Sequence, residues 1–145
     1  MSFEPIGVVR HGYPDDEVRR RRVDGAIVIY DKYVEGLRGL EEFSHIIVIS
    51  YLHRYRGAPL VVRPKRLEAR GLQAPEVGVF ATDSPDRPNP IGVSIVRLLE
   101  VRRGALSVSD LDLFDGTPVL DIKGFSPTRC PEGARAPRWA LADHV

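Results

Sequence analysis

The sequence predicts an all-β fold, a small barrel or sandwich with one or two short helices. Six to eight short apolar or alternating stretches are separated by turns rich in glycine, proline and aspartate, a pattern typical of barrels and sandwiches. Helical spacing of apolar side chains is found over residues 33–40, which predicts one or two helical turns there. With 145 residues and 43% hydrophobic content, the chain fits one compact domain over residues 1–145.

The first half of the chain supplies the predicted core strand. Residues 3–10 and 25–30 are apolar stretches that each suit a strand. Residues 44–52 form the most hydrophobic stretch, with four branched side chains in a row, which favours a strand buried on both faces. Residues 61–62 are expected to form a short strand. Residues 64–75 show no clear periodicity and are expected to form a loop.

A hairpin is predicted in the second half. Residues 93–101 alternate apolar and polar side chains, Arg103-Gly104 suits a tight turn, and residues 105–114 continue as the second strand. A further turn at residues 115–118 precedes a closing strand at residues 119–123.

The loop over residues 78–92, GVFATDSPDRPNPIG, is the candidate binding segment. Its three prolines fix their own φ and force the preceding residues to be extended, so the loop is expected to be stiff. A stiff loop that carries Asp83, Arg87 and Asn89 suits a small polar ligand. The alternative is a proline-stiffened connector in a stable protein.

Charge limits how this chain could bind nucleic acid. The formal net charge is +1, so only local basic clusters could attract a polyanion. The run from Arg19 to Arg22 is either a solvated segment or an anion site. The expected phosphate contacts are Arg19, Arg20, Arg21, Arg22, Arg54, Arg56 and Arg87.

Several other chemistries are disfavoured. The lone Cys130 cannot form a disulfide within the chain, and His11, His45, His53 and His144 lack metal-ligand spacing, so no metal is expected. The dinucleotide and phosphate fingerprints GxGxxG and GxxxxGK[ST] are missing. No apolar run approaches 18 residues and the N-terminus lacks a signal pattern, so we expect a soluble cytoplasmic protein without membrane contact.

Three segments carry a family resemblance. Residues 39–53 (GLEEFSHIIVISYLH), 78–94 (GVFATDSPDRPNPIGVS) and 110–125 (DLDLFDGTPVLDIKGF) resemble the TsaA-like family. Members of that family are S-adenosylmethionine-dependent tRNA methyltransferases that act on N6 of threonylcarbamoyladenosine at position 37. The resemblance implies a β-barrel unrelated to Rossmann methyltransferases. It also implies a homodimer with the cofactor near the subunit junction.

The resemblance carries site residues over to this chain. The implied cofactor contacts are Arg19, Arg20, Arg21, His53, Arg54, Asp83, Val93, Ser109, Asp110, Leu111 and Asp112. The implied tRNA contacts are Arg22, Arg56, Arg87 and Asn89. Two positions depart from the family pattern, which usually has Arg where this chain has Asp83 and Pro-Tyr where it has Gly124-Phe125.

The chemistry requires a proton acceptor near the target nitrogen. Methyl transfer is an in-line displacement, and a carboxylate could remove the proton from N6. The candidates are Asp115 and Asp121, with Lys123 steadying developing charge. In the alternative interpretation, Asp115 caps its turn and Asp121 pairs with Lys123 or an arginine. Two other functions stay open: a non-catalytic barrel that binds S-adenosylmethionine or RNA, and a small-molecule methyltransferase on the same fold.

Overall fold

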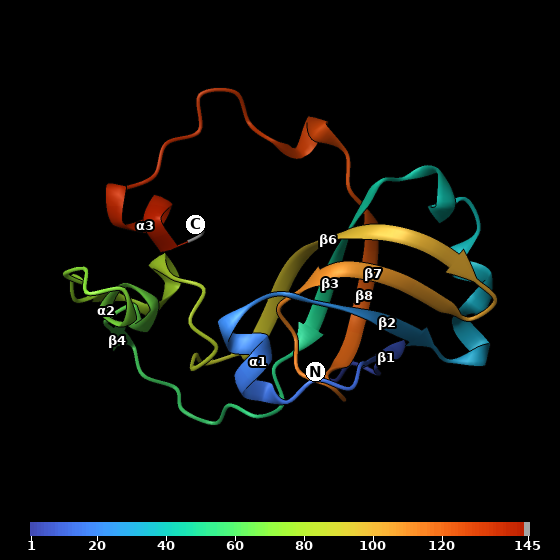
Figure 1. Cartoon of the computed structure of the whole chain (residues 1–145), viewed down its shortest axis with the longest axis horizontal. Coiled ribbons are helices and arrows are strands. Elements are labelled where there is room, and N and C mark those ends of the chain that lie inside the picture. Colours follow the sequence, from blue (N-terminus) through green and yellow to red (C-terminus); the bar gives the residue numbers. More distant parts are fainter. Residues whose placement is uncertain (144–145) are drawn as a thin grey trace. The chain divides into compact units, whose positions relative to one another are not determined.

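Six antiparallel strands close into a barrel in the computed structural model, which describes residues 1–143 (Figure 1). The strands follow the order β1-β2-β7-β6-β3-β8, and β8 pairs with β1 as well as with β3. Because both edges of β8 are paired, the main sheet has no open edge. Their bounds are β1 (Gly7–Arg10), β2 (Val23–Ile29), β3 (His45–Tyr51), β6 (Ile91–Arg102), β7 (Ala105–Leu111) and β8 (Pro118–Gly124).

Alternation along β3 defines the inside of the barrel. Ile46, Val48 and Ser50 are fully buried and point inward, whereas Ile49 and Tyr51 on the other face are partly exposed. The inward residues pair across to β6 at Val96, Ser94 and Gly92, respectively. The predicted core strand is therefore confirmed, but its expected burial on both faces is wrong, because Ile49 and Tyr51 leave the outer face partly exposed.

Short helices flank the barrel strands. They are α1 (Asp15–Arg20), η1 (Asp31–Leu37), η2 (Leu40–Glu42) and η4 (Pro127–Arg129), of which the η elements are 3-10 helices. The N-terminal segment is tied to η1, because the Tyr33 hydroxyl and the Lys32 ammonium donate to Glu4 Oε2 at 2.8 and 3.1 Å. The hydrogen bond from Tyr33, followed by that from Lys32, lowers the pKa of Glu4. The bond to Glu4 in turn raises the pKa of Lys32.

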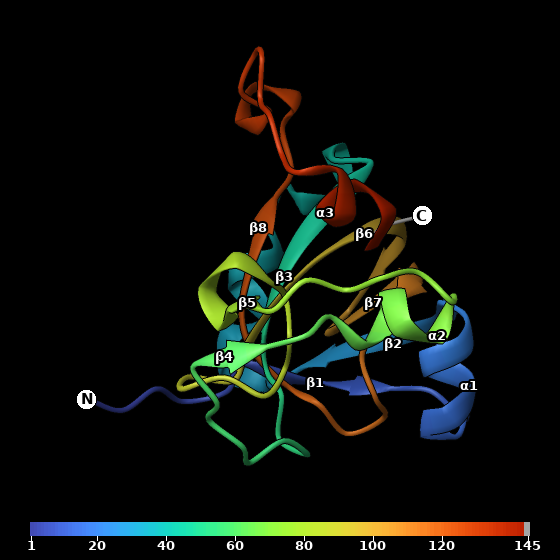
Figure 2. The same cartoon turned by 90° about the vertical axis from the view of Figure 1, so that its left-hand side faces the viewer.

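The chain divides into two compact units. The barrel unit comprises Met1–His53 and Ile91–Arg129, and the second unit comprises Arg54–Pro90 together with the residues from Cys130 onward. The second unit (Figure 2) holds a two-stranded sheet and two helices, α2 and α3, that contact each other. Its elements are β4 (Val61–Val62), α2 (Lys65–Ala69), β5 (Val77–Gly78), η3 (Val79–Ala81) and α3 (Arg138–Asp143). The expectation of one domain over residues 1–145 stays a prediction.

Most local predictions agree with the structure. The all-β barrel, the hairpin over residues 93–113 and the closing strand are confirmed. The loop predicted over residues 64–75 is wrong, because α2 forms there and buries Leu67. Five residues are too few to show helical periodicity in the sequence. The helix predicted over residues 33–40 is 3-10 rather than α.

Charge is distributed unevenly between the units. The barrel unit holds 12 lysines and arginines and 14 aspartates and glutamates, a net charge of −2. The second unit holds 9 basic and 6 acidic residues, a net charge of +3. The net charge of +1 therefore conceals a basic unit and an acidic unit.

Gly92 is required by its partner on β3. A Cβ at position 92 would lie 2.7 Å from Ser50 Oγ and 3.0 Å from a methyl carbon of Leu52. The Ser50 hydroxyl is buried and has no hydrogen-bond partner among the described residues. We therefore expect Gly92→Ala to destabilise the protein by about 1–3 kcal/mol. Ser50→Ala should leave stability unchanged or raise it by about 1 kcal/mol, because it removes an unsatisfied hydroxyl.

Urea unfolding of the single and double variants measures both effects. Because the added Cβ would clash with Ser50 Oγ, Gly92→Ala should cost less stability in the Ser50→Ala background than in the parent chain. Additivity within about 0.5 kcal/mol would contradict it.

Candidate functional site

Several predicted cofactor residues meet at one end of the barrel. Tyr51 at the end of β3 pairs with Ile91 at the start of β6, and Val23 at the start of β2 pairs with Leu111 at the end of β7. In an antiparallel barrel these strand ends form a single rim, which we call the candidate rim. The predicted residues on or next to this rim in the barrel unit are Arg19, Arg20, Arg21, His53, Val93, Ser109, Asp110, Leu111 and Asp112.

The arginine run starts as a helix rather than a loose segment. α1 ends at Arg20, and it is anchored by Val18, which is buried. Arg19 lies over the Phe114 ring, 5.1 Å from its centroid, and so ties α1 to the loop after β7. The cation–π contact of a guanidinium with an aromatic ring favours this placement. Whether the run binds an anion stays a prediction.

The last three arginines of the run differ in their contacts. Arg21 Nη2 donates to Glu17 Oε1 at 2.7 Å, and its guanidinium lies 4.9 Å from the Tyr13 ring centroid. The bonds to Glu17, followed by the contact with Tyr13, raise the pKa of Arg21. Arg20 Nε donates to a backbone carbonyl of the same helix at 3.4 Å. The Arg22 guanidinium has no partner within residues 1–143, so it is available to an incoming anion.

The end of β7 and the residue that follows it place two carboxylates at the rim. Ser94 Oγ, on the inner face of β6, donates to Asp112 Oδ1 at 2.6 Å. Ser109 Oγ donates to Asp110 Oδ2 at 3.3 Å, and Asp110 adopts a left-handed φ of 66°. Non-glycine residues in that conformation are uncommon and cluster at functional sites. Leu111 between them is 0% exposed, so only its backbone could contact a ligand.

The predicted residue Val93 is followed on β6 by Ser94, a residue of the site that the sequence does not reveal. Val93 is 67% exposed on the outer face of β6. Ser94, which sequence analysis missed, lies on the opposite, inner face and is 6% exposed. A buried serine in an alternating strand is ordinary in the sequence, and the contact with Asp112 joins positions 18 residues apart. No local signal could have identified it.

The predicted catalytic residues fall into two clusters. Asp115 Oδ1 accepts a hydrogen bond from the backbone N–H of His11 at 2.9 Å, in the loop before β8. Asp121 and Lys123 lie within β8, where their register partners Ile49 and Ile47 point outward. Lys123 Nζ lies 2.9 Å from Asp121 Oδ2. The ion pair of the alternative interpretation is therefore present, and the catalytic roles stay predictions.

The candidate loop of the second unit is held by its own side chains. Arg87 Nη1 donates to the carbonyl oxygens of Thr82 and Ser84 at 2.7 and 3.2 Å. Thr82 Oγ1 in turn donates to the carbonyl of Val79, which is buried. Arg87 thus stabilises the loop on which Asp83 is carried. The predicted residues of the second unit are Arg54, Asp83, Arg56, Arg87 and Asn89, and their roles stay predictions.

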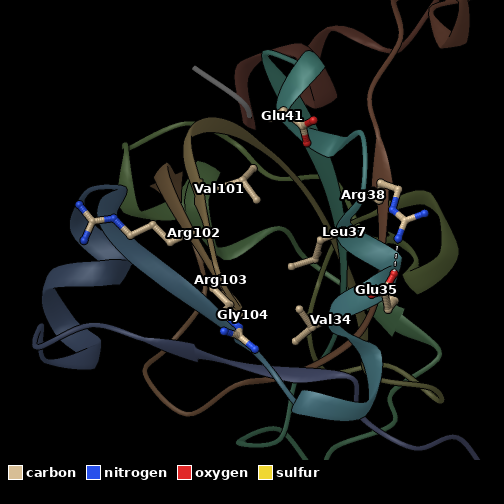
Figure 3. A pocket seen from close by; sticks show the side chains of 9 residues that line it. All are labelled: Val34, Glu35, Leu37, Arg38, Glu41, Val101, Arg102, Arg103 and Gly104. Carbon is tan, nitrogen blue, oxygen red and sulfur yellow. Dashed lines mark hydrogen bonds and ion pairs between the residues drawn. The ribbon is translucent and has the colours of Figure 1, made fainter.

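A hollow of about 330 Å³ lies at the opposite end of the barrel (Figure 3). Val34, Leu37 and Val101 line it, and charged side chains of η1 and the hairpin turn surround it. Arg38 pairs there with Glu35 at 2.7 Å. None of the predicted site residues lines this hollow, and we place the candidate site at the candidate rim.

Residues 1–143 contain neither a metal-ligand cluster nor a helix that could span a membrane. No group of three or more histidine, cysteine, aspartate or glutamate side chains in that part of the chain could hold a metal ion. His144 lies outside the described residues. None of the described helices has the length and apolar character needed to cross a bilayer.

The fold and the rim define a class: a small closed antiparallel barrel with a charged candidate site at one end. The chain belongs to the family of the tRNA-methyltransferase O N-terminal domain, whose model matches residues 8–129. The TsaA-like resemblance is thereby confirmed.

Curated relatives and solved structures agree with this assignment. An S-adenosyl-L-methionine-binding protein of Archaeoglobus fulgidus is 43% identical over 133 residues, covering 88% of this chain and 91% of the relative. The tRNA (adenine(37)-N6)-methyltransferase of Escherichia coli is 39% identical over 141 residues, covering 88% of this chain. The crystal structure of TrmO from Pseudomonas aeruginosa superimposes with a TM-score of 0.71 at 33% identity and 93% coverage of this chain.

The relatives differ in length. This chain covers 58% of the Escherichia coli enzyme and 60% of the Pseudomonas aeruginosa structure. The shared part is thus the barrel-containing portion, and the longer proteins have additional sequence.

The Asp121–Lys123 pair allows a test that separates structure from chemistry. Both side chains are about half exposed, at 48% and 51%, so the pair should contribute less than about 1 kcal/mol to stability. We expect Lys123→Met to change the urea midpoint only slightly. If Lys123 steadies charge in a methyl transfer, the same variant loses activity while it stays folded. A large stability loss would instead assign the pair a structural role.

Proposed function

We propose that this chain is an S-adenosylmethionine-dependent tRNA methyltransferase acting on N6 of threonylcarbamoyladenosine at position 37. The observation that carries the proposal is the convergence of α1, the start of β6 and the Ser109–Asp112 segment on one rim. Family membership and the names of the relatives support it, since these include S-adenosyl-L-methionine-binding proteins and adenine-N6 methyltransferases.

The groups at the candidate rim fit the charges of S-adenosylmethionine. Its amino-acid end carries a carboxylate and an ammonium beside the sulfonium, so it needs both cationic and anionic partners. Arg20 and Arg21 offer guanidinium groups for the carboxylate. Asp112 offers an exposed carboxylate whose second oxygen has no partner among the described residues. Asp83 belongs to the second unit and stands where the family usually has arginine, and its role in cofactor binding stays a prediction.

When bound, the cofactor supplies an electrophilic methyl group. The protein holds the target nitrogen in line with that methyl, and orientation can contribute about 7–11 kcal/mol to the rate. Asp115 Oδ2 or Asp121 accepts the proton that leaves N6, and Lys123 steadies the charge. Asp115 lies in the loop that directly follows the rim segment, which favours it over Asp121.

The tRNA is held by arginines outside the catalytic groups. The Arg22 guanidinium has no partner among residues 1–143, and Arg56, Arg87 and Asn89 belong to the second unit, whose net charge is +3. A basic surface supplies the salt-dependent part of nucleic-acid affinity. Because the proposed substrate is a tRNA, we propose that the protein acts in the cytoplasm.

Labelled S-adenosylmethionine tests the function directly. We expect incorporation of label into tRNA that carries threonylcarbamoyladenosine and none into the same tRNA transcribed without the modification. Label in both tRNAs would overturn the proposed substrate. Cofactor binding without turnover would support the non-catalytic alternative.

The position of Phe125 bears on the non-catalytic alternative. Phe125, which replaces the usual tyrosine, donates its backbone N–H to His45 at 3.0 Å and therefore lies at the end of β8 remote from the candidate rim. Any contribution of this position to the site described here would have to come from a second copy of the chain. The missing phenol matters only in such an assembly. A small-molecule methyltransferase would label neither tRNA but would still bind the cofactor.

We also propose that the protein is a homodimer joined through the outer face of β3 and β6. Ile91, Val93 and Ile95 are 42–67% exposed there. Their register partners on β3 are Tyr51, which is 43% exposed, Ile49, which is partly exposed, and Ile47, which is buried. Alternating strand residues of this kind form one apolar patch. Exposed contiguous apolar patches mark interaction sites, and the family resemblance implies a second copy of this chain as the partner.

Two substitutions test the proposed dimer. The parent should sediment at twice the chain mass of 16.2 kDa, and Ile95→Asp should be a monomer at micromolar concentration. The control is Val28→Asp, which puts the same charge on an exposed residue of β2 and should leave the dimer intact. A monomeric parent would contradict the proposal, as would equal effects of the two variants.

A further inference from the structure

Ser94 is an unusual occupant of the barrel interior. It lies on the inner face of β6 between Gly92 and Val96, opposite Val48, and with Ser50 and Thr117 it is one of the few polar residues buried among the mostly apolar core of residues 1–143. A hydroxyl in such a place needs a hydrogen-bond partner. That partner is Asp112, which follows β7 at the candidate rim and is itself exposed.

The bond between the two side chains is short. Ser94 Oγ and Asp112 Oδ1 are 2.6 Å apart, within the range of about 2.5–2.7 Å that hydroxyl–carboxylate bonds show. Such a charge-assisted bond is roughly twice as strong as a neutral one. Because Ser94 is fixed by the strand pairing of β6, it determines where the first oxygen of Asp112 lies. The second oxygen, Oδ2, is left for another donor.

The charge around Asp112 indicates what kind of donor that is. Asp110 and Asp112 lie two residues apart, and neither forms an ion pair within residues 1–143. Each accepts a serine hydroxyl, which carries no charge. Two carboxylates without a cation favour a positively charged donor over a neutral one.

We propose that Ser94 is a positioning residue that orients the Asp112 carboxylate to receive the ammonium group of the cofactor. The inference rests on the proposed function, because it takes S-adenosylmethionine as the ligand. An ammonium is preferred to the sulfonium because only the ammonium can donate a hydrogen bond to Oδ2.

Calorimetry with three ligands tests this assignment. S-adenosylmethionine and S-adenosylhomocysteine both carry the ammonium, whereas 5′-methylthioadenosine keeps the nucleoside and lacks the amino-acid end. We expect Ser94→Ala to weaken the first two by about tenfold, equal to about 1.4 kcal/mol. The affinity for 5′-methylthioadenosine should change less than about twofold.

Further variants separate positioning from structural damage. Ser50→Ala is the matched control, because it removes a buried hydroxyl from the neighbouring strand that has no partner in the described chain, and it should not change affinity. Ser94→Thr keeps the hydroxyl and should restore binding to within about threefold of the parent. In an Asp112→Asn background, Ser94→Ala should cause little further loss of affinity, because the effects of mutations at two interacting residues do not add.

The outcomes are distinct. Unchanged affinity for S-adenosylmethionine in folded Ser94→Ala would overturn the inference, as would equal weakening of all three ligands. Weakening for S-adenosylmethionine alone would also overturn it, because the sulfonium would then be the partner. A parent chain that binds none of the ligands would refute the proposed function itself. Urea unfolding of each variant confirms that a loss of affinity is not a loss of the fold.

Discussion

Closure of the barrel by β8 is the constraint on which the rest of the structure depends. Because β8 pairs with β1 on one edge and β3 on the other, the strands are held in register and most side chains of β6 alternate between inside and outside. The register shifts only where β2 meets β7, β3 meets β8 and β6 meets β7. That alternation buries Ser94 and exposes Val93 one residue earlier. The same closure brings the ends of β2, β3, β6 and β7 to one rim, although they are far apart in the chain.

The rim shows how electrostatics and packing are combined in this fold. Arg20 and Arg21, at the end of α1, have partners on that helix, and the end of β7 supplies the carboxylates of Asp110 and Asp112, whose partners are serine hydroxyls. Among residues 1–143, no ion pair joins these two arginines to these two carboxylates. A ligand with both charges could therefore be recognised at its two ends by separate elements, each held in place by the barrel.

Sequence patterns predicted the parts of this structure that depend on local chemistry. Alternation over residues 93–113 identified the hairpin, and consecutive branched residues identified β3 as the core strand. α2 was missed because a five-residue helix that buries one leucine leaves no periodic signal. The site was predicted only through the family resemblance. Its Ser94–Asp112 bond joins β6 to the residue that follows β7, 18 positions away in the sequence, and Asp110 adopts a left-handed conformation that its residue type does not require.

The insertion of residues 54–90 between two paired strand ends has a consequence for how such proteins diversify. Tyr51 and Ile91 are direct register partners, so a two-residue turn could join them and leave the hydrogen-bonded ladder of the barrel complete. Selection can therefore lengthen, recharge or replace the insertion without disturbing the closed sheet. A single barrel could in this way serve a series of enzymes whose preferences for nucleic acid diverge through the inserted segment alone.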